Sequence, residues 1–98
     1  MVIIMNEPLT LKLITPEKSY VYENCDSVNL SVNDNSKGNG GGSYGIRKGH
    51  AKAIFSLCEG KLYAIKNGKA IVEGIISSGF SSVENNIVTV IADNFETI

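Results

Sequence analysis

Residues 62–76 have the sequence LYAIKNGKAIVEGII, in which Asn67-Gly68 stands between two runs of strand-forming side chains. A tight two-residue hairpin of the type I′ class needs positive φ at both central residues, and Asn-Gly meets that need better than almost any other pair. The stretch therefore predicts two antiparallel strands joined by a short turn. This hairpin is the strongest local indication that the chain folds as β-structure.

Further strand patterns lie on both sides of this hairpin. Leu9, Leu11 and Leu13 alternate with polar residues, and so do the apolar positions of 28–32, which is typical of strands with one buried face. Turn signals recur about every eight to twelve residues and no 3.6-residue period persists, so we predict an all-β antiparallel sandwich of about eight to ten strands. The other predicted strands are 20–22, 44–46, 53–57, 80–83 and 87–92.

Composition limits the class of protein. With 98 residues, 43% of them hydrophobic and 19% charged, the chain is expected to be a single globular domain, 1–98, with a flexible Gly/Asn-rich loop at about 33–42. A net charge of −1 argues against nucleic-acid binding, which needs an excess of Lys and Arg. No apolar run approaches the roughly 20 residues that span a bilayer. We expect a cytosolic protein that does not insert into the membrane and meets it only through a partner.

Candidate chemical groups are few. Cys25 and Cys58 stand far apart and are expected to be free thiols, and His50, the only histidine, forms no familiar zinc spacing with them. His50 could be a solvated loop residue, an interface residue or, as the remotest alternative, a catalytic one. The glycine-rich run 38–42 is not followed by a helix, so it is not a phosphate-binding loop. The chain is therefore predicted to be no enzyme and to hold neither metal nor cofactor.

Gly79 and Phe80 follow two serines within a β-rich region. Because the chain there is not strand-turn-helix, the run is not a nucleophile elbow. We expect Gly79 to mark a bulge or a close backbone contact in a sheet, with the following aromatic ring filling the space that the glycine leaves open.

Three segments taken together resemble a known family. The first is 11–17 (LKLITPE), followed by 21–23 (VYE) and 26–30 (DSVNL); the second is 44–51 (YGIRKGHA); the third is 77–80 (SSGF) with 86–93 (NIVTVIAD). In order and spacing they are similar to the N-terminal β-sandwich domain of the epsilon subunit of F-type ATP synthase, called delta in mitochondria. The resemblance implies a non-catalytic rotor subunit at the cytoplasmic face of the energy-transducing membrane, binding the gamma subunit and the ring of c subunits. The partner-contacting residues it implies are Ser43, Tyr44, Gly45, Ile46, Arg47, Lys48, Gly49, His50, Ala51, Gly79 and Phe80.

This chain departs from the family pattern at several points. Lys48 and Lys52 stand where prolines are usual, which is expected to loosen the loop, and Ser43 replaces an acidic residue suited to basic c-subunit loops. The connection after Leu30 is also longer. Many members continue after the sandwich into two C-terminal helices, whereas this sequence stops at Ile98, either as a naturally short form or as a truncated piece. Neither helix-mediated inhibition nor nucleotide binding is therefore expected of it. The altered loop leaves a free-standing β-sandwich binding module as the alternative.

Overall fold

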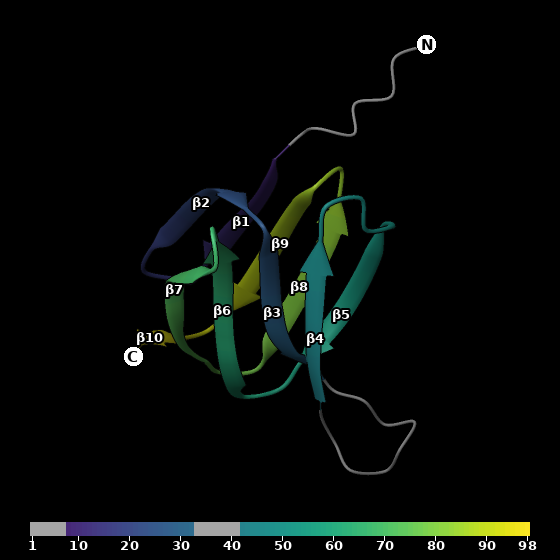
Figure 1. The fold of residues 1–98 in the computed structure, drawn as a ribbon. Coiled ribbons are helices and arrows are strands. Elements are labelled where there is room, and N and C mark those ends of the chain that lie inside the picture. The colour runs from purple at the N-terminus through teal and green to yellow at the C-terminus, as the bar shows by residue number, and fades with distance from the viewer. Residues whose placement is uncertain (1–7, 33–41) are drawn as a thin grey trace.

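The computed structural model describes residues 8–32 and 42–98, and these residues form ten β-strands (Figure 1). No α-helix occurs within the two described ranges, so the predicted all-β class is confirmed. The predicted loop at 33–42 lies outside the described residues, except for Gly42, where a strand begins. The strands are β1 (Leu9–Ile14), β2 (Ser19–Cys25), β3 (Ser27–Val32), β4 (Gly42–Arg47), β5 (Ala53–Leu57), β6 (Gly60–Lys66), β7 (Lys69–Ile76), β8 (Gly79–Glu84), β9 (Ile87–Ala92) and β10 (Phe95–Thr97).

Local backbone chemistry accounts for the tight turns. Asn67 and Gly68 have φ values of 53° and 77°, so the type I′ hairpin between β6 and β7 is confirmed. Asn85 and Asn86, between β8 and β9, also have positive φ, at 52° and 62°. Asparagine tolerates this left-handed region better than other residues with a side chain. Two hairpins are thus encoded by short runs of sequence.

The ten strands form one continuous sheet that folds over into two layers. Its order is β10-β7-β6-β3-β5-β8-β9-β1-β2, and β4 also pairs with β3. β3 pairs with β4 from Ser27 to Val32 but meets β5 only at Val32 and Leu57. The sheet therefore bends between β3 and β5, and Figure 1 shows β6, β3 and β4 in front of β9, β8 and β5. This arrangement is the expected β-sandwich.

Two features of the sheet were absent from the sequence-based expectation. β1 runs parallel to β9, with Leu11 beside Val88 and Leu13 beside Val90, although the other ladders of the described strands are antiparallel. The sequence shows that these segments are strands but not which neighbours they choose. β10 pairs with β7 and was not predicted, because three residues are too few to display a period.

Alternation along the strands places one set of side chains between the layers. β1 buries every second residue from Leu9, and β9 buries Val88, Val90 and Ala92. Tyr20 on β2 meets Phe95 on β10 edge to face, with ring centroids 5.7 Å apart, and this contact helps to close the open side of the sandwich. The buried apolar residues are Leu9, Leu11, Leu13, Cys25, Val28, Leu30, Ile46, Leu57, Leu62, Ala64, Val72, Ile76, Val83, Val88, Val90 and Ala92.

Candidate partner-binding site

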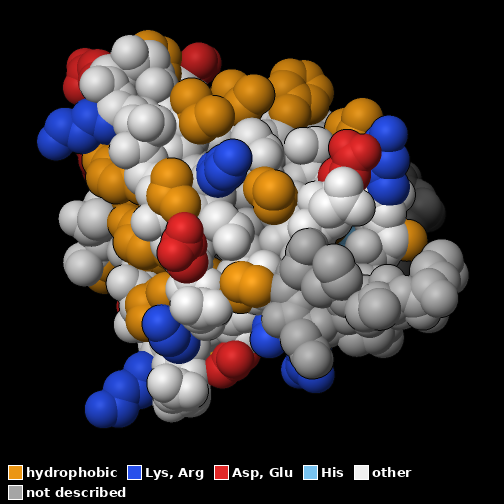
Figure 2. Space-filling model, turned by 90° about the horizontal axis from the view of Figure 1, so that it is seen from above, with side chains coloured by type: hydrophobic (Ala, Val, Ile, Leu, Met, Phe, Trp, Pro, Cys, Tyr) orange, Lys and Arg blue, Asp and Glu red, His pale blue; other side chains and the backbone are white. Residues whose placement is uncertain are grey.

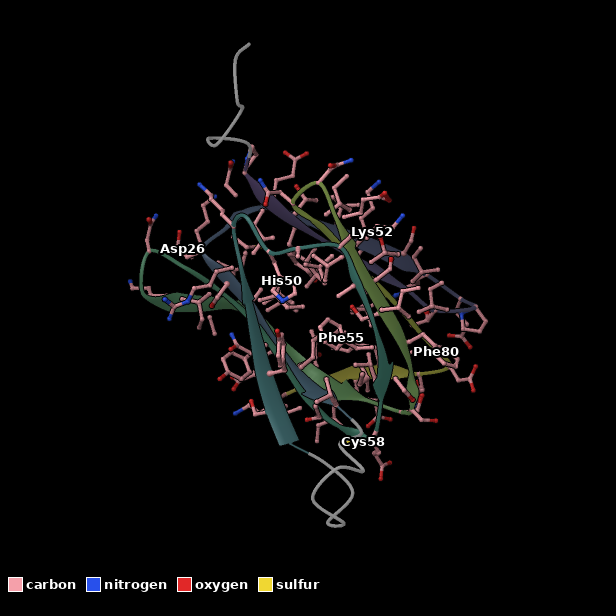
Figure 3. All side chains as sticks on the ribbon, turned by 90° about the vertical axis from the view of Figure 1, so that its right-hand side faces the viewer. Asp26, His50, Lys52, Phe55, Cys58 and Phe80 are labelled. Carbon is pink, nitrogen blue, oxygen red and sulfur yellow. The ribbon has the colours of Figure 1, made fainter. Side chains whose placement is uncertain are left out.

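The loop between β4 and β5 holds the central part of the sequence-predicted site. β4 ends at Arg47, and the backbone N–H of His50 donates to the Arg47 carbonyl at 3.3 Å, which closes a tight turn. Gly49 lies in this turn at φ 81°, a conformation that other residues adopt at a cost. Figure 3 shows His50 directed from this loop into the space between β4 and β5.

His50 is the centre of a small aromatic cluster with Tyr44 and Phe55. Its ring centroid lies 5.7 Å from that of Tyr44 and 6.1 Å from that of Phe55, while the Tyr44 and Phe55 centroids are 4.8 Å apart. β4 and β5 belong to different layers at this corner, and the cluster spans the gap between them. Figure 3 shows His50 and Phe55 lying close together there.

Hydrogen bonds define the protonation pattern of the His50 ring. Its Nδ1 lies 2.7 Å from the Ala51 carbonyl oxygen, and its Nε2 lies 2.8 Å from the Tyr44 hydroxyl. Because a carbonyl oxygen only accepts, Nδ1 carries the proton in the neutral ring, and Nε2 accepts a hydrogen bond from Tyr44. Both ring nitrogens are thus engaged by neighbours within the loop and its supporting strand, an arrangement that orients the ring rather than activating a nucleophile.

The turn between β8 and β9 holds the same loop from the other side. The Gly49 N–H donates to Asn86 Oδ1 at 2.8 Å, and the Lys52 ammonium lies 3.5 Å from the Glu84 carboxylate. The Lys52 and Glu84 side chains are well exposed, so this ion pair contributes little to stability. The hydrogen bond from Gly49, in contrast, connects the main chain of the loop to the side chain of Asn86 in the β8–β9 turn. These contacts oppose the loosening expected from the lysines at the positions where prolines are usual.

The other predicted contact residues near this loop divide by burial. Ser43, Gly45 and Arg47 are exposed on β4, as are Lys48, Gly49 and Ala51 in the loop. Ile46, in contrast, is fully buried and belongs to the core, so its side chain is not available to a partner.

Gly79 and Phe80 lie at the other end of the β5–β8 ladder. Ala53, next to the loop, pairs with Val83, whereas Leu57 at the far end of β5 pairs with Gly79. Figure 3 likewise shows Phe80 well away from His50. The structure therefore divides the predicted site into two separate surfaces.

The close backbone contact predicted at Gly79 is present. A Cβ atom at this position would collide with the carbonyl oxygen of Ile91 and come within 3.0 Å of Ala92 Cα. Phe80, however, does not fill the space beside the glycine, because the residue points outward and is 62% exposed. That expectation was wrong, because alternation along β8 turns the ring outward while its neighbour Ser81 enters the core.

Phe80 belongs to an outer sheet face on which exposed apolar side chains alternate with polar ones, and we call its apolar members the Phe80 face. Its members lie on the outer side of the layer formed by β5, β8, β9, β1 and β2, and cross-strand pairing places Phe80 beside Ile91. β9 has apolar residues at odd-numbered as well as even-numbered positions, and this is the sequence signal that could have revealed the apolar side chains on the outer face. A strand of this kind is typical of a sheet that is covered on both faces. Figure 2, a view from above, shows hydrophobic side chains at the surface with polar and charged ones between them. The Phe80 face comprises Ile14, Val21, Ile54, Phe80, Ile87 and Ile91.

The remaining candidate groups point to no further site. Cys25 and Cys58 are free, and burial raises the pKa of the Cys25 thiol, which makes it less nucleophilic. Across residues 8–32 and 42–98 there is no group of three or more His, Cys, Asp or Glu side chains that could hold a metal ion. In the same part of the chain no helix has the length and apolar character needed to cross a membrane.

Comparison with known proteins places the chain in a family. Residues 8–98 match the model of the ATP synthase delta/epsilon chain β-sandwich domain. This chain belongs to the ATP synthase delta/epsilon family. Curated epsilon chains are similar over most of its length: that of Nitratidesulfovibrio vulgaris strain DP4 is 32% identical over 92 residues, and that of Desulfitobacterium hafniense strain DCB-2 is 36% identical over 88 residues. These matches cover 94% and 89% of this chain but only 63% and 60% of the relatives.

Solved structures support the delta/epsilon fold. A chain in the Euglena gracilis mitochondrial ATP synthase, in an assembly of OSCP, F1 and c-ring, superposes with a TM-score of 0.75 at 22% identity, covering 94% of this chain and 56% of that one. A chain from the central stalk and c-ring of the Tetrahymena thermophila mitochondrial enzyme gives a TM-score of 0.66 at 17% identity, with 89% and 64% coverage. At these identities the likeness concerns the fold.

Proposed function

We propose that this chain is a non-catalytic central-stalk subunit of the F1 part of an ATP synthase. In this role it binds the gamma subunit and the c-ring and helps to couple ion flow through the ring to ATP synthesis. It works as a peripheral part of the complex, at the cytoplasmic face of the energy-transducing membrane. The observation that carries the proposal is the family match over residues 8–98.

The two surfaces of the predicted site suit such a role. A rotor part must contact more than one neighbour and keep its contact surfaces in fixed relation. The loop at 48–52 is connected to the β8–β9 turn by the hydrogen bond from Gly49 to Asn86, and Phe80 projects from the far end of β8. A densely packed sandwich holds the two surfaces apart as one stiff body.

The proposal is tested by recovering the chain from membranes. An affinity-tagged chain, expressed in its own organism, should retain gamma and c subunits after mild detergent extraction, identified by mass spectrometry. Phe80→Ser should reduce recovery of the partners, whereas Ile75→Ser, a control at an exposed apolar position on the other layer, should not. Extraction of the tagged chain without gamma would overturn the proposal.

The second candidate is a free-standing β-sandwich module that binds a different protein. The observation in its favour is the basic loop, where Lys48 is exposed and Lys52 pairs with Glu84. A gene outside an ATP synthase operon, together with a partner other than gamma in the membrane experiment, would favour this alternative.

A further inference from the structure

A surface hollow lies beside Phe80 at the end of the β8–β9 ladder. Its volume is about 390 Å³, and its lining includes Ser78, Gly79, Phe80, Ile91 and Asp93. Small-molecule sites occupy roughly 300–1,000 Å³, so a space of this size is large enough for one long side chain. The hollow is open to the surface and lies at the border of the Phe80 face.

The apolar wall of the hollow follows from strand pairing. Phe80 and Ile91 are direct cross-strand partners and point outward, and the two residues are 62% and 55% exposed. Next to them Gly79 has no side chain, and the closeness of the Ile91 carbonyl leaves no room for one. Gly79 therefore contributes only main chain to the lining of the hollow.

Asp93 gives the hollow a negative charge. It follows β9 directly, two residues after Ile91, so its carboxylate lies at the rim beyond the apolar wall. Asp93 also borders a second hollow that Glu17 and Lys18 help to line. The ion pairs found in the described part of the chain, Lys52–Glu84 and Lys61–Glu73, do not involve Asp93.

We propose that this hollow receives a lysine or arginine side chain of the protein partner that covers the Phe80 face. The inference rests on the proposed function, in which that partner is part of the central stalk. The methylene stem of such a residue packs on Phe80 and Ile91, while its charged head reaches the Asp93 carboxylate. A cation over the phenyl ring gains further attraction from the ring quadrupole.

Charge decides between this occupant and a wholly apolar one. Covering the Phe80 face with an apolar side chain would remove water from Asp93 and give it no counter-charge, which is costly. A basic side chain pairs the carboxylate as it is covered. The same residue therefore satisfies both the apolar wall and the acidic rim.

The experiment measures binding of the purified chain to the gamma subunit of the same organism by calorimetry, at low and at raised ionic strength. Asp93→Asn should weaken binding about tenfold and make it less sensitive to salt, because one desolvated charge pair is lost. Glu96→Gln, which removes one exposed carboxylate beside Ile75 on the other layer, is the matched control and should bind like the wild type. Phe80→Ala should weaken binding without changing the salt dependence.

The outcomes separate the two hypotheses. If the wild type binds gamma and Asp93→Asn binds equally well or more tightly, the basic occupant is wrong and the proposed function stands. If the wild type does not bind gamma at all, the proposed function fails and the inference fails with it. If the wild type instead forms a dimer in sedimentation that Phe80→Ala abolishes, a second copy covers this face and the inference is overturned.

Discussion

Replacing Gly79 by alanine should destabilise the protein well beyond the usual effect of one added methyl group. The new Cβ would collide with the Ile91 carbonyl and lie 3.0 Å from Ala92 Cα, and both are main-chain atoms of β9. The methyl can be accommodated only if the β8 and β9 backbones move apart. Overpacking of this kind costs about 1–3 kcal/mol, against a gain of about 0.4–1 kcal/mol from the less flexible unfolded chain.

The expected net loss is about 1.3 kcal/mol in the free energy of unfolding, or about 8 °C in melting temperature for a domain of this size. Urea unfolding followed by circular dichroism and a thermal scan would measure both. Gly45→Ala is the matched control: its Cβ would meet the flexible side chain of Asn29, whose Oδ1 lies 3.0 Å away and can swing aside. Equal urea midpoints for the two variants would refute the argument that the β8–β9 backbone contact excludes a side chain.

Three further predictions concern the loop and the core. Tyr44→Phe keeps the ring contacts but removes the hydroxyl that donates to His50 Nε2, so the free energy of unfolding should fall by about 1 kcal/mol. Nitrogen NMR of the wild type should show that the neutral form of the His50 ring carries its proton on Nδ1, and a proton on Nε2 in that form would contradict the hydrogen-bond assignment. In Asn86→Gly the new glycine can adopt the positive φ of this position, but the acceptor of the Gly49 N–H is lost. Hydrogen exchange of the Gly49 amide should therefore accelerate, and an unchanged exchange rate would mean that this hydrogen bond does not hold the loop. Ser81→Ala should raise the unfolding free energy by about 1 kcal/mol, because the buried Ser81 hydroxyl has no hydrogen-bond partner among the described residues; a clear loss of stability in urea would show that the hydroxyl is satisfied.

The candidate site was only partly predictable. The strand expected at 44–46 is present within β4, because strand propensity depends on nearby residues. The contacts of His50 with Phe55, and of Gly49 with Asn86, join segments that are distant in sequence. Whether Phe80 turns inward or outward depends on which face of β8 meets the core, a choice that the serines around it left open.

The sequence by itself determined the all-β class, most of the strands and the Asn67-Gly68 hairpin. Those features come from the two-residue period of side chains along a strand and from the φ values that Asn and Gly allow, and both act over a few residues. Only the tertiary structure decided that β1 lies parallel to β9, that β10 exists, and that Gly79 and Phe80 stand apart from the His50 loop. Strand pairing joins residues far apart in the chain, and the best partner is set by how the whole core packs rather than by any local pattern.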